Sequence, residues 1–429
     1  MSGRAWPEHR TSRAPDMPDS HQDQEQLIAA GIPESEVERQ LEMLTHPPEP
    51  PRLVRPCTLG DGILQISRSE QDDLVSEWQR AAAAGRFTKF VPASGAASRL
   101  FQGLDDPQSA ESQRWAQRAN AFPPVATLRE LPKGLLPFHH YGDETRRAFT
   151  EQLVEGVGHL SDEHGRCRYH FTVAAPHRDR FEHQLARDAV RLKETRGISV
   201  EVDFSTQDPA TDTVALDESG SPARASNGEL LLRPSGHGAL IDNLERLDAD
   251  LVFIKNIDNI QPEAGQQRVI HWKRVLAGLL VRMAREHQEP TPMRVCGMVR
   301  NTGEPGGGPF WVEDRLGEVR PQIVEIAQVS SAADQQDVVA GSTHFNPVDL
   351  VCSMRGADGS GYALTDFIDP EAIVVTTKTH EGQKIRTLER PGLWNGAMAG
   401  WKTVFVEVPE ETFTPVKTVL DLLRPEHIA

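Results

Sequence analysis

The chain lacks the long apolar runs that a membrane-spanning helix requires. No stretch of about 18 or more consecutive apolar residues occurs among its 429 residues. Its first residues carry charge but have no apolar core behind them, so they do not resemble a secretion signal. We therefore expect a cytoplasmic protein that does not bind a membrane.

Cysteine and basic residues are also scarce. Only four cysteines occur, and no two have the spacing of a zinc ribbon or a redox pair. Lysine and arginine total 46 against 63 acidic residues, which gives a formal net charge of -17. Because a general nucleic-acid-binding protein presents a basic face, we expect no nucleic-acid partner. A local basic pocket for phosphate groups stays compatible with this composition.

The first 50 residues are expected to form a disordered tail with short helices and a proline-rich linker. Residues 1–23 are polar and dotted with proline, which predicts a disordered tail. Short helices are expected at 24–30 and 34–44. The proline-rich segment 47–52 then predicts a stiff extended linker.

After the linker, apolar strands alternate with amphipathic helices as far as residue 320, and strands dominate residues 321–429. This alternation favours an α/β fold with a doubly wound, largely parallel sheet. The run Gly306–Gly308 is expected to form a β-turn, since no helix signal follows it. The expected strands cover 88–92, 170–174, 198–204, 251–254, 293–299, 322–327, 372–377 and 403–408, and the expected helices cover 72–84, 178–194 and 270–283.

The most informative stretch is 233–259, which combines a glycine-rich loop, a short helix and a strand that ends in Asn-Ile-Asp-Asn. Ligands of α/β sheets bind where the carboxyl ends of parallel strands open into loops. Asp258 stands at such an end, where a carboxylate can hold Mg²⁺ for nucleotide chemistry. The alternative for Asp258 is a turn residue or a helix N-cap. Asp248 and Asp250 precede the same strand, so we expect them at the surface of the other edge.

A second loop follows the strand at 88–92. The small residues Ala93, Ser94, Gly95 and Ala96 lie between that strand and a predicted helix, so their backbone N–H groups could cradle a phosphate. Arg99, in the first turn of this helix, could neutralise phosphate charge. The alternative is an ordinary tight turn between a strand and a helix.

Residues 91–101 resemble the Leu-x-x-Gly-x-Gly-Thr-Arg-Leu signature of sugar-phosphate nucleotidyltransferases, the pyrophosphorylases of the GT-A type. Ala97 and Ser98 stand where the signature has its last glycine and its threonine. Residues 131–138 are similar to the Pro-Lys-x-Leu-Leu-Pro segment of the same enzymes. The resemblance implies that Lys133 contacts the reacting phosphates, whereas a lone lysine in such a turn is otherwise a solvated surface residue.

Residues 234–241, which read Pro-Ser-Gly-His-Gly-Ala-Leu-Ile, resemble a glycine loop of UDP-sugar pyrophosphorylases. That loop lies against the nucleotide, which implies nucleotide-binding roles for Gly236, His237 and Gly238. The alternative for His237 is a simple hydrogen bond to the backbone.

Residues 250–260 resemble the strand of the same enzymes that ends in Asn-x-Asp-Asn. The resemblance implies that Asp258 is the metal ligand and that Asn256 contacts substrate nearby.

Later segments extend the resemblance. Residues 321–328 are similar to a Pro-x-Val-Val-Glu-Tyr-Ser-Glu segment whose first glutamate holds sugar hydroxyls, which implies this role for Glu325. The second glutamate of that segment is Gln328 here. Lys378 matches a lysine that reaches the phosphates.

Residues 391–398 resemble an Asn-Gly turn before a strand, which implies that Asn395 and Gly396 contact substrate. The lysine and glutamate that follow this turn in the pyrophosphorylases are missing here.

From about residue 55 to its end, the chain is also similar to one bacterial family of unknown function. The shared motifs include Pro-Ala-Ser-Gly-Ala-Ala, Gly-His-Gly-Ala-Leu-Ile and Phe-Ile-Lys-Asn-Ile-Asp-Asn. This likeness implies the fold more firmly than the reaction, because a fold does not fix a function.

Together these resemblances imply a GT-A-like (Rossmann-like) α/β fold with a doubly wound mixed sheet. Residues 51–320 would form the nucleotidyltransferase-like core, and the strand-rich residues 321–429 would complete the sugar pocket. The implied reaction joins a nucleoside triphosphate and a sugar 1-phosphate, with Mg²⁺ as cofactor. The alternatives are a glycosyltransferase that uses a nucleotide sugar and a non-catalytic nucleotide-sugar binding protein. The oligomeric state stays open.

Overall fold

The computed structural model describes residues 17–18, 20–95, 97–118, 122–287, 289–303, 306–345 and 349–427, without the side chains of residues 98, 99 and 118. Most of the predicted disordered tail lies outside these residues. The chain forms two compact units. The first consists of Met1–Pro50, Asp208–Ala239 and Asp369–Ala397, and the second of Pro51–Gln207, Leu240–Ile368 and Met398–Ala429.

The smaller unit, the first of these two, packs two helices on a three-stranded sheet. Helices α1 (His21–Ala30) and α2 (Glu34–Thr45) form where the sequence predicts them. Ser20 caps α1, because its hydroxyl accepts a hydrogen bond from the backbone N–H of Asp23 at 3.1 Å. The sheet has the order β15 (Val374–His380), β16 (Gln383–Glu389) and β9 (Ala215–Leu216). Its core contains Leu27, Ile32, Val37, Leu41, Leu44, Val214, Leu216, Leu230 and Leu388.

The larger unit contains a nine-stranded sheet with eight neighbouring pairs. Strand β14 is antiparallel to both of its neighbours, β10 and β11, and the other six pairs are parallel. The predicted mixed sheet is therefore confirmed. Its strand order is β2 (Thr58–Leu59), β3 (Gly62–Leu64), β17 (Lys402–Glu407), β11 (Met293–Met298), β14 (Asp349–Ser353), β10 (Leu251–Ile254), β4 (Phe87–Pro92), β7 (Arg166–Thr172) and β8 (Ser199–Ser205).

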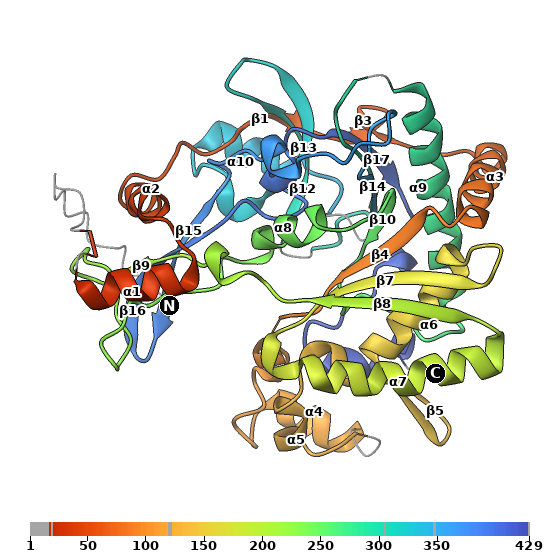
Figure 1. The fold of residues 1–429 in the computed structure, drawn as a ribbon, viewed down its shortest axis with the longest axis horizontal. Helices are drawn as coiled ribbons and strands as arrows, with labels where there is room; N and C mark the ends of the chain where they lie inside the picture. The colour runs from red at the N-terminus through yellow and green to blue at the C-terminus, as the bar shows by residue number, and fades with distance from the viewer. Residues whose placement is uncertain are drawn as a thin grey trace. The chain divides into compact units, whose positions relative to one another are not determined.

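Helices flank this sheet on both sides. Helix α9 packs against α3 and α6, and α6 packs against α7, so these four helices form a row. Helix α8 lies on the other side of β10 from α9 (Figure 1). The sheet is thus doubly wound, as predicted. The bounds are α3 (Arg68–Ala83), α6 (Ala148–Leu160), α7 (Arg178–Arg196), α8 (Leu240–Glu245) and α9 (Gln266–Glu286).

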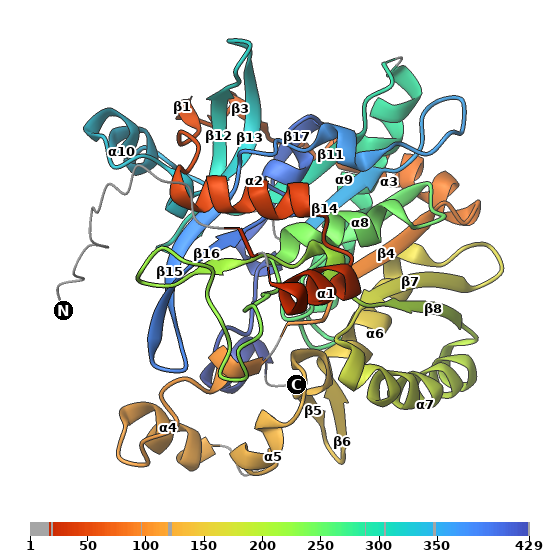
Figure 2. The same cartoon turned by 60° about the vertical axis from the view of Figure 1, so that its left-hand side comes forward.

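Smaller elements of the larger unit include a second, three-stranded sheet (Figure 2). Its hairpin corrects one prediction: Gly307 and Gly308 do not form a turn but begin β12, opposite Glu325 and Val324 of β13. The turn of this hairpin lies farther on, where the backbone N–H of Gly317 donates to Asp314. The elements are β1 (Arg52–Pro56), β12 (Gly307–Glu313), β13 (Val319–Glu325), β5 (Pro137–Tyr141), β6 (Glu144–Arg147), α4 (Ala110–Arg118), α5 (Val125–Arg129) and α10 (Ala333–Ala340).

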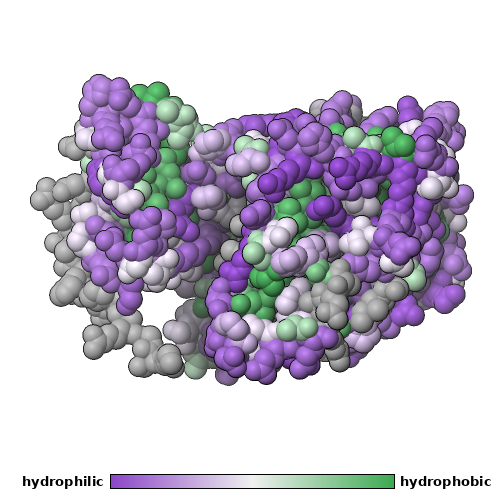
Figure 3. Space-filling view, turned by 90° about the horizontal axis from the view of Figure 1, so that it is seen from below, coloured by the Kyte–Doolittle hydropathy of each residue, from purple (hydrophilic) through white to green (hydrophobic). Residues whose placement is uncertain are grey.

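Hydrophilic side chains cover most of the face drawn in Figure 3, in keeping with the charge of the chain. The most exposed large apolar side chains, Ile28, Val190 and Leu316, lie on different elements and do not form one patch. Within the described part of the chain, no helix is both long and apolar enough to cross a membrane.

The core of the larger unit encloses a cluster of charged side chains, here called the buried charge cluster. It comprises Lys89 of β4, Glu155 of α6, Lys255 just after β10, Lys273 of α9 and Asp349 of β14, and each side chain is at most 4% exposed. The carboxylate of Glu155 receives Nζ of Lys89 and Nζ of Lys255, each at 2.9 Å. Lys273 forms an ion pair with Asp349.

Three ammonium groups thus share two carboxylates. Burial lowers the pKa of Lys89 to about 7. Burial alone would raise the pKa of Glu155, but the surrounding lysines outweigh it and hold that pKa well below its usual value. The cluster is therefore built around Glu155 as its central anion.

We predict that Glu155→Gln destabilises the protein more than Lys89→Met does. Without Glu155, three buried lysines face one carboxylate, and the loss of such a partner costs about 3–5 kcal/mol. Without Lys89, two lysines and two carboxylates remain in balance, so the loss is smaller. Urea unfolding followed by tryptophan fluorescence measures both free energies, and a larger loss for Lys89→Met would contradict the role of Glu155.

Candidate functional site

Two of the predicted site residues meet at the edge of the nine-stranded sheet. Asp258 lies in the turn that follows β10, and its carboxylate forms an ion pair with the ammonium group of Lys133. The side chain of Asp258 is 8% exposed and that of Lys133 is 18% exposed. The pair therefore sits at the boundary between the core and solvent, at the carboxyl end of a parallel strand, where α/β proteins bind ligands.

The local sequence explains how Lys133 reaches this position. Pro132 is the N-cap of the short 3-10 helix Lys133–Leu135, and its carbonyl accepts the N–H of Leu135 at 2.9 Å. Gly134 packs closely here: a Cβ atom on it would lie 2.9 Å from the ring of Phe181 and 3.4 Å from Ile257. The Pro-Lys-Gly sequence thus holds Lys133 directly against the turn that carries Asp258.

A second positive charge approaches the same carboxylate. Nζ of Lys417 lies 3.8 Å from the carboxylate of Asp258, although its own side chain is 62% exposed. Burial opposes ionisation of Asp258, but Lys133 and then Lys417 outweigh it and hold its pKa below the usual value. Asp258 is thus an anion at neutral pH.

The loop of small residues emerges beside this turn. Ala93 follows β4, which is parallel to β10, and the N–H of Lys255 donates to the carbonyl of Phe90 at 3.2 Å. The N–H of Ala93 is already bonded to Thr172, whereas Ser94 is partly exposed and Gly95 is exposed. Of the four predicted phosphate contacts, Ala96 lies outside the described residues.

The segment after this loop differs from the prediction. It is not an α-helix but the 3-10 helix Ala97–Phe101, so it offers fewer aligned N–H groups for a phosphate. Ala97 is 5% exposed and belongs to the main hydrophobic core, so the methyl group that replaces the usual glycine hydrogen is buried there. The side chain of Arg99 lies outside the described residues.

Asp258 could serve as one protein ligand of a Mg²⁺ ion. The ionised carboxylate of Asp258 is a hard oxygen ligand, and Mg²⁺ often takes only one or two carboxylates together with substrate phosphates and waters. In the part of the chain that the structure describes, no group of three or more His, Cys, Asp or Glu residues could hold a metal ion. A cation here would therefore depend on oxygen atoms of the substrate.

The predicted glycine loop belongs to the smaller unit. Nδ1 of His237 accepts a hydrogen bond from the N–H of Leu393 at 2.8 Å, and its ring stacks on Trp394 with centroids 4.5 Å apart. A side chain at Gly238 would collide with the carbonyl of Pro391. Packing against residues 391–394 thus accounts for His237 and Gly238, and Gly236 has the positive φ of 82° that favours glycine.

The other predicted residues of the smaller unit lie in the segment that packs on this loop or in the sheet. Lys378 was predicted to follow a strand. It lies instead within β15, where its Nζ pairs with Glu389 at 2.6 Å. Asn395 is 2% exposed, and its N–H donates to Gly392. Gly396 accepts the N–H of Asp369 through its carbonyl.

Glu325 and Asn256 lie in the larger unit. Glu325 ends β13 and shares a capping box with Gln328, so both residues already stabilise a 3-10 turn. Asn256 occupies the same turn as Asp258, and its carbonyl accepts a hydrogen bond from Gln152. Among the predicted residues that the structure describes, the larger unit brings Asn256, Asp258 and Lys133 together.

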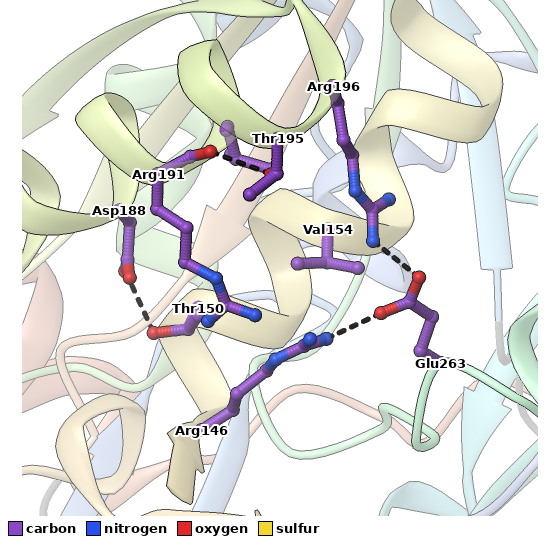
Figure 4. A pocket seen from close by; sticks show the side chains of 9 residues that line it. Arg146, Thr150, Val154, Asp188, Arg191, Thr195, Arg196 and Glu263 are labelled. Atoms are coloured by element: carbon purple, nitrogen blue, oxygen red, sulfur yellow. Dashed lines mark hydrogen bonds and ion pairs between the residues drawn. The ribbon is translucent and has the colours of Figure 1, made fainter. Parts of the chain in front are cut away.

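A pocket of about 230 Å³ lies elsewhere in the larger unit, between α6 and α7 (Figure 4). Arg146 pairs there with Glu263 at 2.7 Å and with Glu144 at 3.0 Å, and Arg191 and Arg196 pair with the same two carboxylates. Its arginines thus have carboxylate partners within the protein.

The Asp248 and Asp250 pattern lies at the amino end of β10, as expected. Asp248 pairs with Arg355 and its side chain is 94% exposed. Asp250 lines a depression of about 590 Å³ at that edge.

Two features near the site escaped the sequence analysis. Lys417 lies in a segment without a recognisable pattern. The buried charge cluster has a clear signal, since Lys89 and Lys255 each interrupt or end an apolar strand. A lysine in such a position requires a buried carboxylate partner.

The chain belongs to the DUF4301 family, a domain of unknown function, whose model matches residues 20–122, 126–291 and 286–428. No curated protein shows significant similarity to it.

Several solved structures share its fold at low identity. The UDP-N-acetylglucosamine pyrophosphorylase from Trypanosoma brucei is 16% identical with a TM-score of 0.56, over 90% of this chain and 74% of that one. A protein described as such an enzyme, from Entamoeba histolytica, is 12% identical with a TM-score of 0.52, over 84% of this chain and 83% of that one. The UDP-glucose pyrophosphorylase from Leishmania major, in complex with UDP-glucose, is 14% identical with a TM-score of 0.50, over 94% of this chain and 78% of that one. The GT-A-like, pyrophosphorylase-type fold is thereby confirmed.

We predict that Lys133→Met destabilises the protein by about 1–3 kcal/mol at pH 7, because it leaves the buried carboxylate of Asp258 without its hydrogen-bonded partner. Since the folded pKa of Asp258 is depressed, the stability that it contributes is present above its unfolded pKa of about 3.9 and is lost as pH falls through the folded pKa. The difference between wild type and variant should therefore shrink below about pH 4.

Urea unfolding at a series of pH values measures this difference. Lys417→Met, which removes the more exposed and more distant lysine, serves as the matched control and should have a smaller effect. A difference for Lys133→Met that does not change with pH would contradict the ion pair.

Proposed function

We propose that this member of the DUF4301 family joins a nucleoside triphosphate and a sugar 1-phosphate to give a nucleoside diphosphate sugar and pyrophosphate. Two observations support the proposal: the fold is that of UDP-sugar pyrophosphorylases, and a lysine and a carboxylate meet at the carboxyl edge of the sheet. The pair of Lys133 and Asp258 is the observation that carries it, because it combines the two charges that triphosphate chemistry needs.

The reaction requires positioning and charge neutralisation more than bond-making by the protein. A phosphate oxygen of the sugar 1-phosphate attacks the α-phosphorus in line, and the bond to the β-phosphate oxygen breaks, which releases pyrophosphate. No covalent intermediate with the protein is needed. Fixed positive charges near the leaving pyrophosphate therefore provide most of the catalysis.

Lys133 would supply such a charge. It is held in a 3-10 turn and is partly open to solvent, and it forms an ion pair with the carboxylate of Asp258. When a triphosphate binds, its oxygens replace that carboxylate as the partner of the ammonium group. Arg99 is proposed to neutralise the same phosphates from the 3-10 helix Ala97–Phe101 that follows the loop.

Asp258 would hold Mg²⁺, with the remaining ligands supplied by phosphate oxygens and waters. The ion, when bound, neutralises charge on the leaving pyrophosphate. Asp258 is suited to this because Lys133 and Lys417 keep its carboxylate ionised. Asn256 would contact substrate from the same turn.

The remaining roles stay predictions from the resemblance. The small residues Ala93–Ala96 and the loop Gly236–Gly238 would line the nucleotide. Glu325, Asn395 and Gly396 would contact the sugar, and Lys378 would approach the attacking phosphate. The side chains of His237, Glu325 and Lys378 would first have to exchange the contacts within the protein that are described above.

The direct test is to incubate the protein with Mg²⁺, a nucleoside triphosphate and a sugar 1-phosphate, and to measure pyrophosphate release. All four ribonucleoside triphosphates are tried against a panel of sugar 1-phosphates, beginning with UTP. For an active pair, Lys133→Met and Asp258→Asn should each lower kcat about 100-fold or more, the usual loss on removing one charge-stabilising group. Asp248→Asn is the matched control and should leave kcat unchanged, because Asp248 is exposed at the other edge.

Four results would contradict the proposal or part of it. No pyrophosphate release with any pair would exclude the activity, and binding of a nucleotide sugar without turnover would favour a non-catalytic protein. Sugar transfer from a nucleotide sugar that depends on Asp248 would favour the glycosyltransferase alternative. Release that survives Asp258→Asn would exclude Asp258 as the metal ligand.

A further inference from the structure

The buried side chain of Gln152 forms hydrogen bonds with the backbone of the turn that carries Asp258. Its Nε2 donates to the backbone carbonyl of Asn256 at 3.0 Å and lies 3.3 Å from the carbonyl of Ile257. Gln152 itself is fully buried in α6. It is the side chain that connects this helix to the backbone immediately before Asp258.

Gln152 is in turn fixed by the buried charge cluster. It precedes Glu155 by three residues, so both side chains lie on one face of α6. Nζ of Lys89 bridges this turn of the helix, because it donates to the main-chain carbonyl of Gln152 at 3.0 Å and to the carboxylate of Glu155 at 2.9 Å. Since moving such charges out of their pairing is costly, the position of this helical turn is narrowly defined.

The cluster reaches the same turn by a second route. Lys255 directly precedes Asn256, and its ammonium pairs with Glu155 at 2.9 Å and with Asp349 at 3.6 Å. Both the start of the turn and the donor beneath it are therefore anchored to the carboxylate of Glu155.

On the other side, the C-terminal segment completes the support. The N–H of Val416 donates to the carbonyl of Asp258 at 3.0 Å, and the N–H of Thr414 donates to the side chain of Asn259 at 3.0 Å. These bonds fix the end of the turn, and within it the N–H of Asn259 donates to the carbonyl of Asn256 at 3.2 Å. Gln152 adds a side-chain donor from α6 to the carbonyls of Asn256 and Ile257. Its loss would thus loosen the middle of the turn selectively.

We propose that Gln152 is a positioning residue, which holds the Asn256–Asp258 turn so that the carboxylate of Asp258 is set for a divalent cation, and that the buried charge cluster fixes Gln152 in turn. The cation part of this inference rests on the proposed function, whereas the support of the turn does not. Outer partners of metal ligands typically change metal affinity about 10- to 100-fold when they are removed.

The test uses Gln152→Met, which keeps the volume of the side chain and removes its donor. The matched control is Gln266→Met: Gln266 is also buried in the larger unit and donates to a backbone carbonyl, that of Gln261, outside the turn. Hydrogen exchange of residues 255–260 in the ligand-free protein reads the turn directly, because the N–H of Asn259 donates to Asn256. Titration with Mn²⁺, followed by electron paramagnetic resonance, reads the metal site, and Asp258→Asn identifies the binding that depends on Asp258.

We expect exchange in this segment to rise about fivefold in Gln152→Met, and the Asp258-dependent affinity for Mn²⁺ to fall about tenfold or more, with neither change in Gln266→Met. Unchanged exchange in Gln152→Met, or an equal rise in both variants, would overturn the proposal. Looser exchange with unchanged Mn²⁺ affinity would overturn its metal part. If wild-type Mn²⁺ binding does not depend on Asp258, the metal assignment of the proposed function fails, and the exchange result alone decides the role of Gln152.

Discussion

The carboxylate of Glu155 is the anion on which the middle of the larger unit depends. Lysines from β4 and from the end of β10 donate to it, and α9 contributes a third lysine nearby. Without a carboxylate at this point, two neighbouring strands and α9 would bring like charges together in the core. The antiparallel strand β14 supplies the second anion, Asp349, between β10 and β11. The one reversal of strand direction in the sheet thus coincides with the place where the core needs a second negative charge.

This arrangement also explains why the candidate site lies where it does. The sequence from Lys255 to Asp258 contains two charges three residues apart, and they face different surroundings: the ammonium group of Lys255 points into the buried cluster, and the carboxylate of Asp258 meets Lys133 near solvent. The buried ion pairs of Lys255 hold the start of the turn, and the carboxylate of Asp258 is presented at the other end of the same turn. The same short motif therefore contributes to both stability and the candidate chemistry.

The elements that could be predicted are those whose signal is local. Helices α1 and α2 and the buried strand β10 follow from the local sequence, and Asp258 follows from its position after that strand. Strand β14 was missed because its apolar run is short, with only Leu350–Cys352 between polar ends. Strand β12 was missed because the glycines at its start are typical of turns. Lys89 and Lys255 in or after apolar strands indicate buried charges, but their partners lie far apart in sequence, and no local pattern identifies them.

The contacts of His237 within the protein differ from the nucleotide-binding role that the resemblance implies for it. Its loop matches a nucleotide-binding motif, yet the contacts of the smaller unit account for each part of it: the ring nitrogen caps the N–H of Leu393, the ring stacks on Trp394, and Gly238 makes room for Pro391. Lys133 and Asp258 differ from it in one physical respect. Their mutual contact is an ion pair next to solvent. A polyanion can replace Asp258 as the partner of Lys133, and a cation can replace Lys133 as the partner of Asp258. The ion pair is thus a contact that a ligand could exploit, whereas the packing around His237 would have to be broken.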